Sequence, residues 1–239
     1  MAFADTPCPD FILSAAHILT GADVSGAMQV IDDGAVLVQA GLIAAIGTLV
    51  DLTRDNPDIE VRGGRDMIAM PGLANSHHHF GLTPLMMGVP FAPLELWLPQ
   101  FRKMRQVNLR LDTLYSAIEM LESGTTTVQH INSGLSGPEE TWDRATDEII
   151  SAYGEIGMRS GYCFMIRDQN ILSYEDDAKV LAALPEEVRE WLAPSMQAAK
   201  TPARAYMDFF SRQHRKWSKR SPDMVRMNLA PANLHWCSD

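Results

Sequence analysis

The sequence of 239 residues predicts an α/β protein in which a small β module precedes a sheet of parallel strands. Two observations lead to this fold class. Residues 11–70 consist of short apolar or alternating runs separated by glycines, which is the pattern of strands and turns. From Met70 onward, strand-like segments alternate with helical ones, and that order requires parallel strands joined by right-handed crossovers.

The β module contains three segments of strand length. Gly21, Gly34, Gly41 and Gly47 punctuate them as turn residues do. The segments are ILSAAHIL, GAVLVQAGLIAAIG and DIEVRGGRDMIAM. We assign residues 1–66 to this module, as the first of two expected domains.

Residues 67–239 form the second expected domain, in which strands alternate with helices. Leu114, Ile118 and Leu121 repeat at the spacing of one helical face, and Gly124 follows where a helix end favours glycine. The four expected strands lie at about 67–76, 125–131, 158–166 and 224–230. A (β/α)8 barrel has eight such strands, so these four correspond to half of one barrel.

Composition limits the classes of function. With 46% hydrophobic and 21% charged residues, the chain has the composition of an ordinary soluble globular protein. Its net charge of −10 argues against nucleic-acid binding, which requires a concentrated basic surface. No apolar run reaches the ~18 residues that a membrane span needs. Self-association into a homo-oligomer is left open by these features.

The cysteines and the first residues predict a cytoplasmic protein. Cys8, Cys163 and Cys237 are odd in number and far apart, so they fit neither a disulfide framework nor a C-x-x-C metal clip. The N-terminal residues, MAFADTPCPDF, include acidic residues and prolines where a signal peptide has a basic patch and an apolar core. A reduced, cytoplasmic environment is the simplest interpretation.

The most informative segment is residues 71–80, PGLANSHHHF. Alternate side chains of a strand point the same way, so His77 and His79 are expected to project together, with His78 on the opposite face. Two imidazoles on one face make half of a divalent-metal site, and neutral imidazole suits zinc, iron or nickel. The carboxyl end of a parallel strand is also where barrel enzymes build active sites. The alternative is a solvated histidine cluster in a loop.

Five segments make the chain resemble the amidohydrolase superfamily, in its branch of cytosine deaminases, chlorohydrolases and thioadenosine deaminases. They occur in the family's order and are DGAVLVQAGLIAAIG (33–47), MPGLANSHHHF (70–80), PLELWL (93–98), ESGTTTVQH (122–130) and APANLHWCSD (230–239). The resemblance implies a partial (β/α)8 TIM-type barrel, about its first four β/α units, behind an N-terminal β-sandwich segment. It also implies that His77 and His79 bind a divalent metal, with zinc foremost and iron as the alternative.

The same resemblance indicates two residues that bind a small heterocyclic substrate. Members of the branch have a pocket tryptophan on the helix after the first barrel strand, and Trp97 stands in the matching place. His130 ends the second strand, where a side chain can face the pocket. Ordinary packing is the alternative for both. Relatives that deaminate thioadenosine have a histidine after the proline of the fourth strand and a carboxylate after the tryptophan, where this chain has Ala232 and Gln106.

Together these features predict a metal-dependent hydrolase acting on the non-peptide C–N bonds of a cyclic amidine or amide, or of an aminated heterocycle. Metal-activated water would attack the ring carbon, and ammonia or an equivalent group would leave. The family takes further histidines and a glutamate from strands five and six, and an aspartate from strand eight, so we assign no catalytic acid or base here. We expect a truncated chain that is inactive alone. The alternative is a non-catalytic scaffold, which would have no need for the histidine pair.

Overall fold

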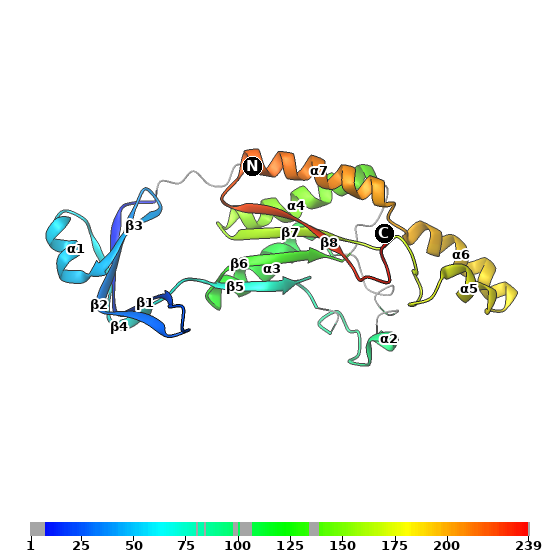
Figure 1. The fold of residues 1–239 in the computed structure, drawn as a ribbon, viewed down its shortest axis with the longest axis horizontal. Helices are drawn as coiled ribbons and strands as arrows, with labels where there is room; N and C mark the ends of the chain where they lie inside the picture. The colour runs from blue at the N-terminus through cyan, green and yellow to red at the C-terminus, as the bar shows by residue number, and fades with distance from the viewer. Residues whose placement is uncertain are drawn as a thin grey trace. The chain divides into compact units, whose positions relative to one another are not determined.

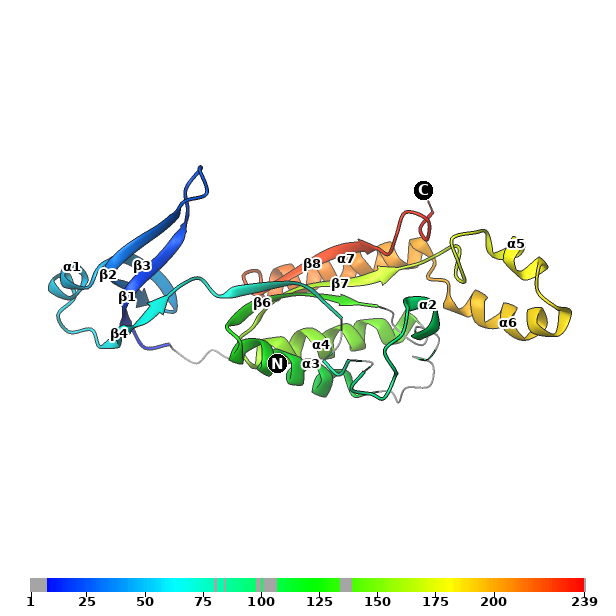
Figure 2. The ribbon, with the colours of Figure 1, turned by 90° about the horizontal axis from the view of Figure 1, so that it is seen from below.

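The computed structural model describes residues 8–79, 81–83, 85–97, 100, 107–133 and 139–238. The chain falls into two compact units, one ending at Leu73 and the other beginning at Ala74. Figures 1 and 2 show the elements of each unit as ribbons. Among the helices of the described residues, none combines the length and the apolar character that a membrane crossing requires.

The first unit is a four-stranded sheet with one helix. Its strands lie in the order β3-β2-β1-β4. β2 pairs antiparallel with both β1 and β3, whereas β4 lies parallel to β1. The elements are β1 (Phe11–Ala22), β2 (Met28–Gln39), β3 (Leu42–Thr48), α1 (Leu49–Asp55) and β4 (Val61–Ala69).

Local sequence explains how this sheet forms. Ala40 and Gly41 connect β2 to β3, and both have positive φ angles (49° and 76°), as a two-residue hairpin turn of type I′ requires. The hydroxyl of Thr48 begins α1 by accepting a hydrogen bond from the backbone N–H of Asp51 at 3.2 Å. The buried core of the unit is Ile12, Ala35, Leu37 and Leu52. The strands and turns predicted for this part of the sequence are confirmed.

The second unit is a sheet with helices packed on one face. Its strands lie in the order β5-β6-β7-β8, and β7 pairs in parallel with both β6 and β8. The arrow of β5 points the same way as that of β6 (Figure 1). The strands are β5 (Leu73–His78), β6 (Thr125–Asn132), β7 (Arg159–Ile166) and β8 (Val225–Pro231). The α-helices are α2 (Leu94–Trp97), α3 (Leu109–Glu122), α4 (Trp142–Glu155), α5 (Asp177–Ala182), α6 (Glu186–Ala199) and α7 (Ala203–Arg220).

The predicted α/β fold with a parallel sheet is confirmed, and one of its four strands lies elsewhere than expected. β6, β7 and β8 match the predicted segments within one residue at each end. The first strand, predicted over 67–76, is interrupted. Residues up to Ala69 belong to β4 of the first unit, and β5 starts only at Leu73. Pro71 explains the interruption, because proline has no N–H to donate to a sheet ladder.

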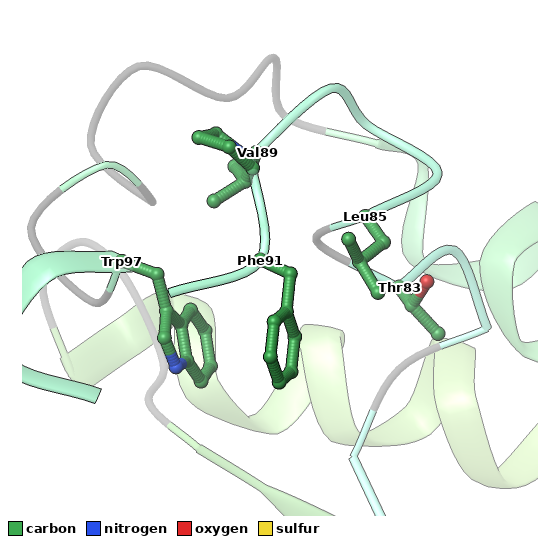
Figure 3. A pocket seen from close by; sticks show the side chains of 6 residues that line it. Thr83, Leu85, Val89, Phe91 and Trp97 are labelled. Carbon is green, nitrogen blue, oxygen red and sulfur yellow. The ribbon is translucent and has the colours of Figure 1, made fainter. Parts of the chain in front are cut away.

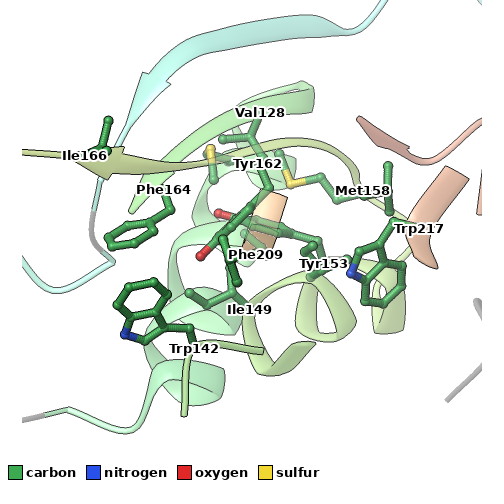
Figure 4. Close-up of a cluster of buried hydrophobic side chains, with 14 of the residues drawn as sticks. Val128, Trp142, Ile149, Tyr153, Met158, Tyr162, Phe164, Ile166, Phe209 and Trp217 are labelled. Atoms are coloured by element: carbon green, nitrogen blue, oxygen red, sulfur yellow. The ribbon is translucent and has the colours of Figure 1, made fainter. Parts of the chain in front are cut away.

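Aromatic side chains form the core of the second unit (Figure 4). The ring of Phe164 on β7 lies edge-to-face with Trp142 of α4 at 5.4 Å between centroids and with Phe209 of α7 at 5.9 Å. Trp142 and Phe209 also meet edge-to-face at 5.9 Å. Such pairs add to the free energy of burying the rings. One buried cluster therefore packs α4 and α7 against the same face of the sheet, at β7.

Replacing Phe209 with alanine should lower the free energy of unfolding by about 3–5 kcal/mol, because a ring packed on two aromatic neighbours leaves a cavity. Phe209 is 1% exposed, whereas Met207, on the same helix, is 46% exposed. Met207→Ala is therefore the matched control, with an expected loss below about 1 kcal/mol. Urea unfolding of both variants measures the difference. Equal losses would contradict this assignment of the core.

Candidate metal centre and substrate pocket

His77 and His79 converge at the end of β5. Their Nε2 atoms lie 2.9 Å apart, and their rings meet edge-on with centroids 4.7 Å apart. His78 points away from this pair, since its ring lies 5.5 Å from that of His130. The side chains therefore alternate at this strand end as the sequence predicts. Metal binding by the pair stays a prediction.

The neighbouring strand orients the ring of His79. Its Nδ1 lies 2.9 Å from the carbonyl oxygen of Ile131, on β6, and 2.8 Å from the hydroxyl of Ser133. A carbonyl oxygen can only accept a hydrogen bond, so Nδ1 carries the proton. The neutral ring then has its lone pair on Nε2, the atom that faces His77. Ser133 was missed by the sequence analysis, although it directly follows a strand end, as His79 does.

The arrangement fits a divalent cation. Zinc binds imidazole nitrogen at about 2.0–2.1 Å, and two nitrogens 2.9 Å apart can both lie at that distance from one ion. Metal-binding histidines usually donate the N–H of their other ring nitrogen to an oxygen of the protein, and the Nδ1 of His79 faces such an oxygen, the Ile131 carbonyl. Within the residues that the structure describes, no cluster of three or more His, Cys, Asp or Glu side chains is placed to hold a metal. The pair can thus offer two imidazole nitrogens to one ion.

His130 lies away from the position expected for a substrate-binding residue. It is 4% exposed, its Nδ1 lies 2.9 Å from the hydroxyl of Tyr153 on α4, and its ring stacks on Tyr162 at 5.7 Å. Burial, with smaller contributions from the charges of His78 and His79, lowers the pKa of His130 to about 3. The side chain faces the helices rather than the face that carries His79. We therefore assign His130 to the core, which agrees with ordinary packing, the alternative that the sequence left open for it.

Trp97 lines an apolar pocket (Figure 3). It is the last residue of α2, and its ring lies beside that of Phe91. The cavity has a volume of about 220 Å³, which suits one small ring, and Thr83, Leu85, Val89 and Pro90 complete its lining. Thr83 is four residues beyond His79 in the sequence. Substrate binding by Trp97 stays a prediction.

Ala232 and Gln106 are the positions at which the sequence departs from relatives that deaminate thioadenosine, and His235 lies three residues beyond Ala232. Ala232 follows β8, and its N–H donates to the carbonyl of Ile166 at 3.1 Å. His235 is exposed and meets the ring of Tyr174 edge-on at 5.7 Å. Gln106 lies outside the described residues.

Comparison with known proteins identifies the family. The sequence model of the amidohydrolase family matches residues 68–219. The chain belongs to the amidohydrolase family. A relative in this family is the 5'-deoxyadenosine deaminase of Methanocaldococcus jannaschii, which is 30% identical over 128 residues. That match covers 52% of this chain and 30% of the relative.

Solved structures show the same fold. The triazine hydrolase of Arthrobacter aurescens superposes with a TM-score of 0.69 at 18% identity, over 97% of this chain and 48% of that one. An adenosine deaminase of Xanthomonas campestris with bound zinc gives a TM-score of 0.56 at 20% identity, over 93% of this chain and 43% of that one. This amidohydrolase chain therefore spans about half the length of the structures it resembles.

The buried His130 should make stability depend on pH. An unfolded histidine has a pKa of about 6.5, whereas that of His130 in the folded chain is about 3. Between these values the unfolded chain binds more protons than the folded chain. The stability that the uncharged His130 contributes is therefore fully present above pH 6.5 and is lost progressively toward pH 3. From pH 7 to pH 5 we expect a loss of about 2 kcal/mol from this group.

His130→Phe should reduce this pH-dependent loss, because phenylalanine fills a similar volume and does not titrate. Urea unfolding at pH 7 and pH 5 measures the difference. The control is His214→Phe, which changes an exposed histidine of α7 and should leave the loss as in the unmodified chain. If His130→Phe loses as much unfolding free energy between pH 7 and pH 5 as the unmodified chain, the ring of His130 is not held uncharged by burial.

Proposed function

We propose that this amidohydrolase chain contributes the first two metal ligands, His77 and His79, of a metal-dependent hydrolase that cleaves C–N bonds in a nitrogen heterocycle. The observation that carries the proposal is the 2.9 Å approach of the two Nε2 atoms, with the Nδ1 of His79 held by the Ile131 carbonyl. Zinc in one structural neighbour supports a divalent metal. Zinc is the ion we propose first, with iron as the alternative.

We also propose that the second unit is the first part of a (β/α)8 barrel and the first unit a segment of a β-sandwich. The support is the parallel sheet with α3, α4 and α7 packed on one face. In such barrels active sites lie at the carboxyl ends of the strands, and the histidine pair is at that end of β5. The expected boundary at residue 66 would then shift to the neighbourhood of Leu73.

The residues of this chain would have three roles: to bind the metal, to orient a metal ligand and to bind the substrate. A divalent metal, when bound, supplies activation of water for attack on the C–N carbon. His77 and His79 would hold that ion through neutral Nε2 atoms, and Ile131 and Ser133 would keep the ring of His79 turned toward it. Phe91 and Trp97 would stack on the flat substrate ring, since both line the apolar pocket.

The names of the relatives guide the substrate class. The matched proteins are a 5'-deoxyadenosine deaminase, a triazine hydrolase and an adenosine deaminase. Their named substrates share a nitrogen heterocycle, and an amino group or an equivalent leaving group on such a ring is what we propose for this chain. A pocket of about 220 Å³ favours a compact ring.

A non-catalytic scaffold with the same fold is the second candidate. Catalytic zinc usually has three protein ligands, and the described residues bring together two imidazoles without a third metal-binding side chain. This ligand set leads us to expect that the chain alone binds metal weakly and does not turn over substrate. Metal binding separates the candidates, because a scaffold has no use for the pair.

Zinc titration followed by calorimetry tests the metal site. One weakly bound zinc ion is expected, and His77→Gln or His79→Gln should each weaken binding about tenfold or more. His78→Gln is the matched control, because His78 belongs to the same motif and points to the opposite face. Equal binding by all variants, or none by the unmodified chain, would favour the scaffold. Robust zinc-dependent hydrolysis of triazine, cytosine or guanine-like compounds by this chain alone would contradict the two-ligand interpretation.

Binding of a flat heterocycle should depend on Trp97. Removing one stacked ring is expected to weaken the binding of an aminotriazine about three- to tenfold, as the loss of an aromatic pair does. Ligand-observed NMR with Trp97→Ala measures this. Trp191→Ala is the control, because Trp191 is 73% exposed on α6 and lies outside the pocket lining. If both variants bind like the unmodified chain, Trp97 is a packing residue.

A further inference from the structure

The segment that follows His79 is attached to helix α3 by one carboxylate. Asp112 accepts a hydrogen bond from the backbone N–H of Gly81 at 2.9 Å and another from that of Leu82 at 2.7 Å. Both bonds have the short lengths of charge-assisted contacts. Asp112 lies in the first turn of α3, which starts at the capping residue Asn108. A rigid helix therefore holds the backbone just beyond the histidine motif.

The approach of this segment to α3 requires glycine at position 81. A Cβ atom added to Gly81 would lie 2.0 Å from the backbone carbonyl oxygen of Asp112, a distance that non-bonded atoms do not reach. Gly81 is buried in this contact. The two hydrogen bonds and the close packing are therefore parts of one docking arrangement, which an added methyl group would displace.

The same stretch of chain is held from the sheet as well. The ring of His79 is fixed by the Ile131 carbonyl and the Ser133 hydroxyl, which lie at the end of β6. Two residues later the backbone is fixed by Asp112. A ligand at a strand end keeps its geometry only if its backbone is supported, because small shifts of a loop misplace the coordinating atom.

We propose that Asp112 is a positioning residue for the metal centre, holding the backbone after His79 so that its Nε2 stays beside that of His77. Asp112 would not touch the metal or the substrate. Its two accepted hydrogen bonds would instead limit the movement of the segment that carries a ligand. The proposal rests on the proposed metal site at His77 and His79.

The test compares zinc affinity and amide hydrogen exchange in four variants of the full chain. Asp112→Ala removes both acceptors and should weaken zinc binding about tenfold, as loss of supporting hydrogen bonds does in metal sites. It should also speed exchange at the Gly81 and Leu82 amides. Asp112→Asn keeps one acceptor oxygen, so an intermediate effect is expected. Gly81→Ala should act like Asp112→Ala through steric displacement, with the carboxylate intact.

The fourth variant, Asp143→Ala, is the matched control. Asp143 is also an acidic residue in the first turn of a long helix, α4, where it pairs with Arg212 of α7 at 3.3 Å, so its replacement removes a charge and its hydrogen bonds at a place remote from the histidine motif in the sequence. Zinc affinity and exchange at Gly81 and Leu82 should not change in it. Exchange at the amide of Ile149, inside α4, reports the change in global stability of each variant, and exchange at Gly81 and Leu82 is compared with it.

The outcomes separate this proposal from the metal site itself. If the unmodified chain binds zinc and both Asp112→Ala and Gly81→Ala bind it equally well, the positioning role is overturned. If the unmodified chain binds no zinc, the proposed metal site fails. Amide exchange then still tests whether Asp112 holds the backbone of Gly81 and Leu82. Unchanged exchange at Gly81 and Leu82 in Asp112→Ala would then overturn the attachment as well, and faster exchange would support it.

Discussion

The contact between the Nδ1 of His79 and the carbonyl oxygen of Ile131 links the candidate site to the fold. Because that oxygen accepts and cannot donate, it determines which nitrogen of His79 carries the proton. It also joins the end of β5 to the end of β6, so the ligand geometry depends on the pairing of these two strands. The proposed metal site is therefore a product of sheet formation rather than of the histidine motif alone.

The opposite face of the same strands has a different chemistry. His78 and His130 lie on the helix side, where Tyr153 and Tyr162 surround the ring of His130. Burial keeps His130 uncharged at neutral pH, since its pKa falls to about 3. The hydrogen bond to Tyr153 satisfies its Nδ1 and reduces the cost of burying a polar ring. His78 and His130 thus lie on the core face of the sheet, and His77 and His79 form the proposed site on the other face.

The sequence predicted the convergence of His77 and His79 because alternation along a strand is local and needs no knowledge of neighbours. It left two alternatives open for His130, substrate contact and ordinary packing, for a related reason. β6 carries Val128, His130 and Asn132 on one face and Gln129 and Ile131 between them. Both sets mix polar and apolar residues, so the pattern does not say which face meets the helices. That choice depends on how the strand packs, which is a tertiary property.

By itself, the sequence determined the α/β class, three of the parallel strands, the alternation at the histidine motif and the residues that resemble the amidohydrolase family. These follow from periodicity and from short motifs, which act over a few residues. Only the tertiary structure decided that Pro71 separates β4 from β5, that His130 is a core residue, and that Ile131, Ser133 and Asp112 support the segment of His79. The contacts of Ile131, Ser133 and Asp112 join residues 30 to 54 positions apart, and no local pattern encodes which distant backbone group will meet a given side chain.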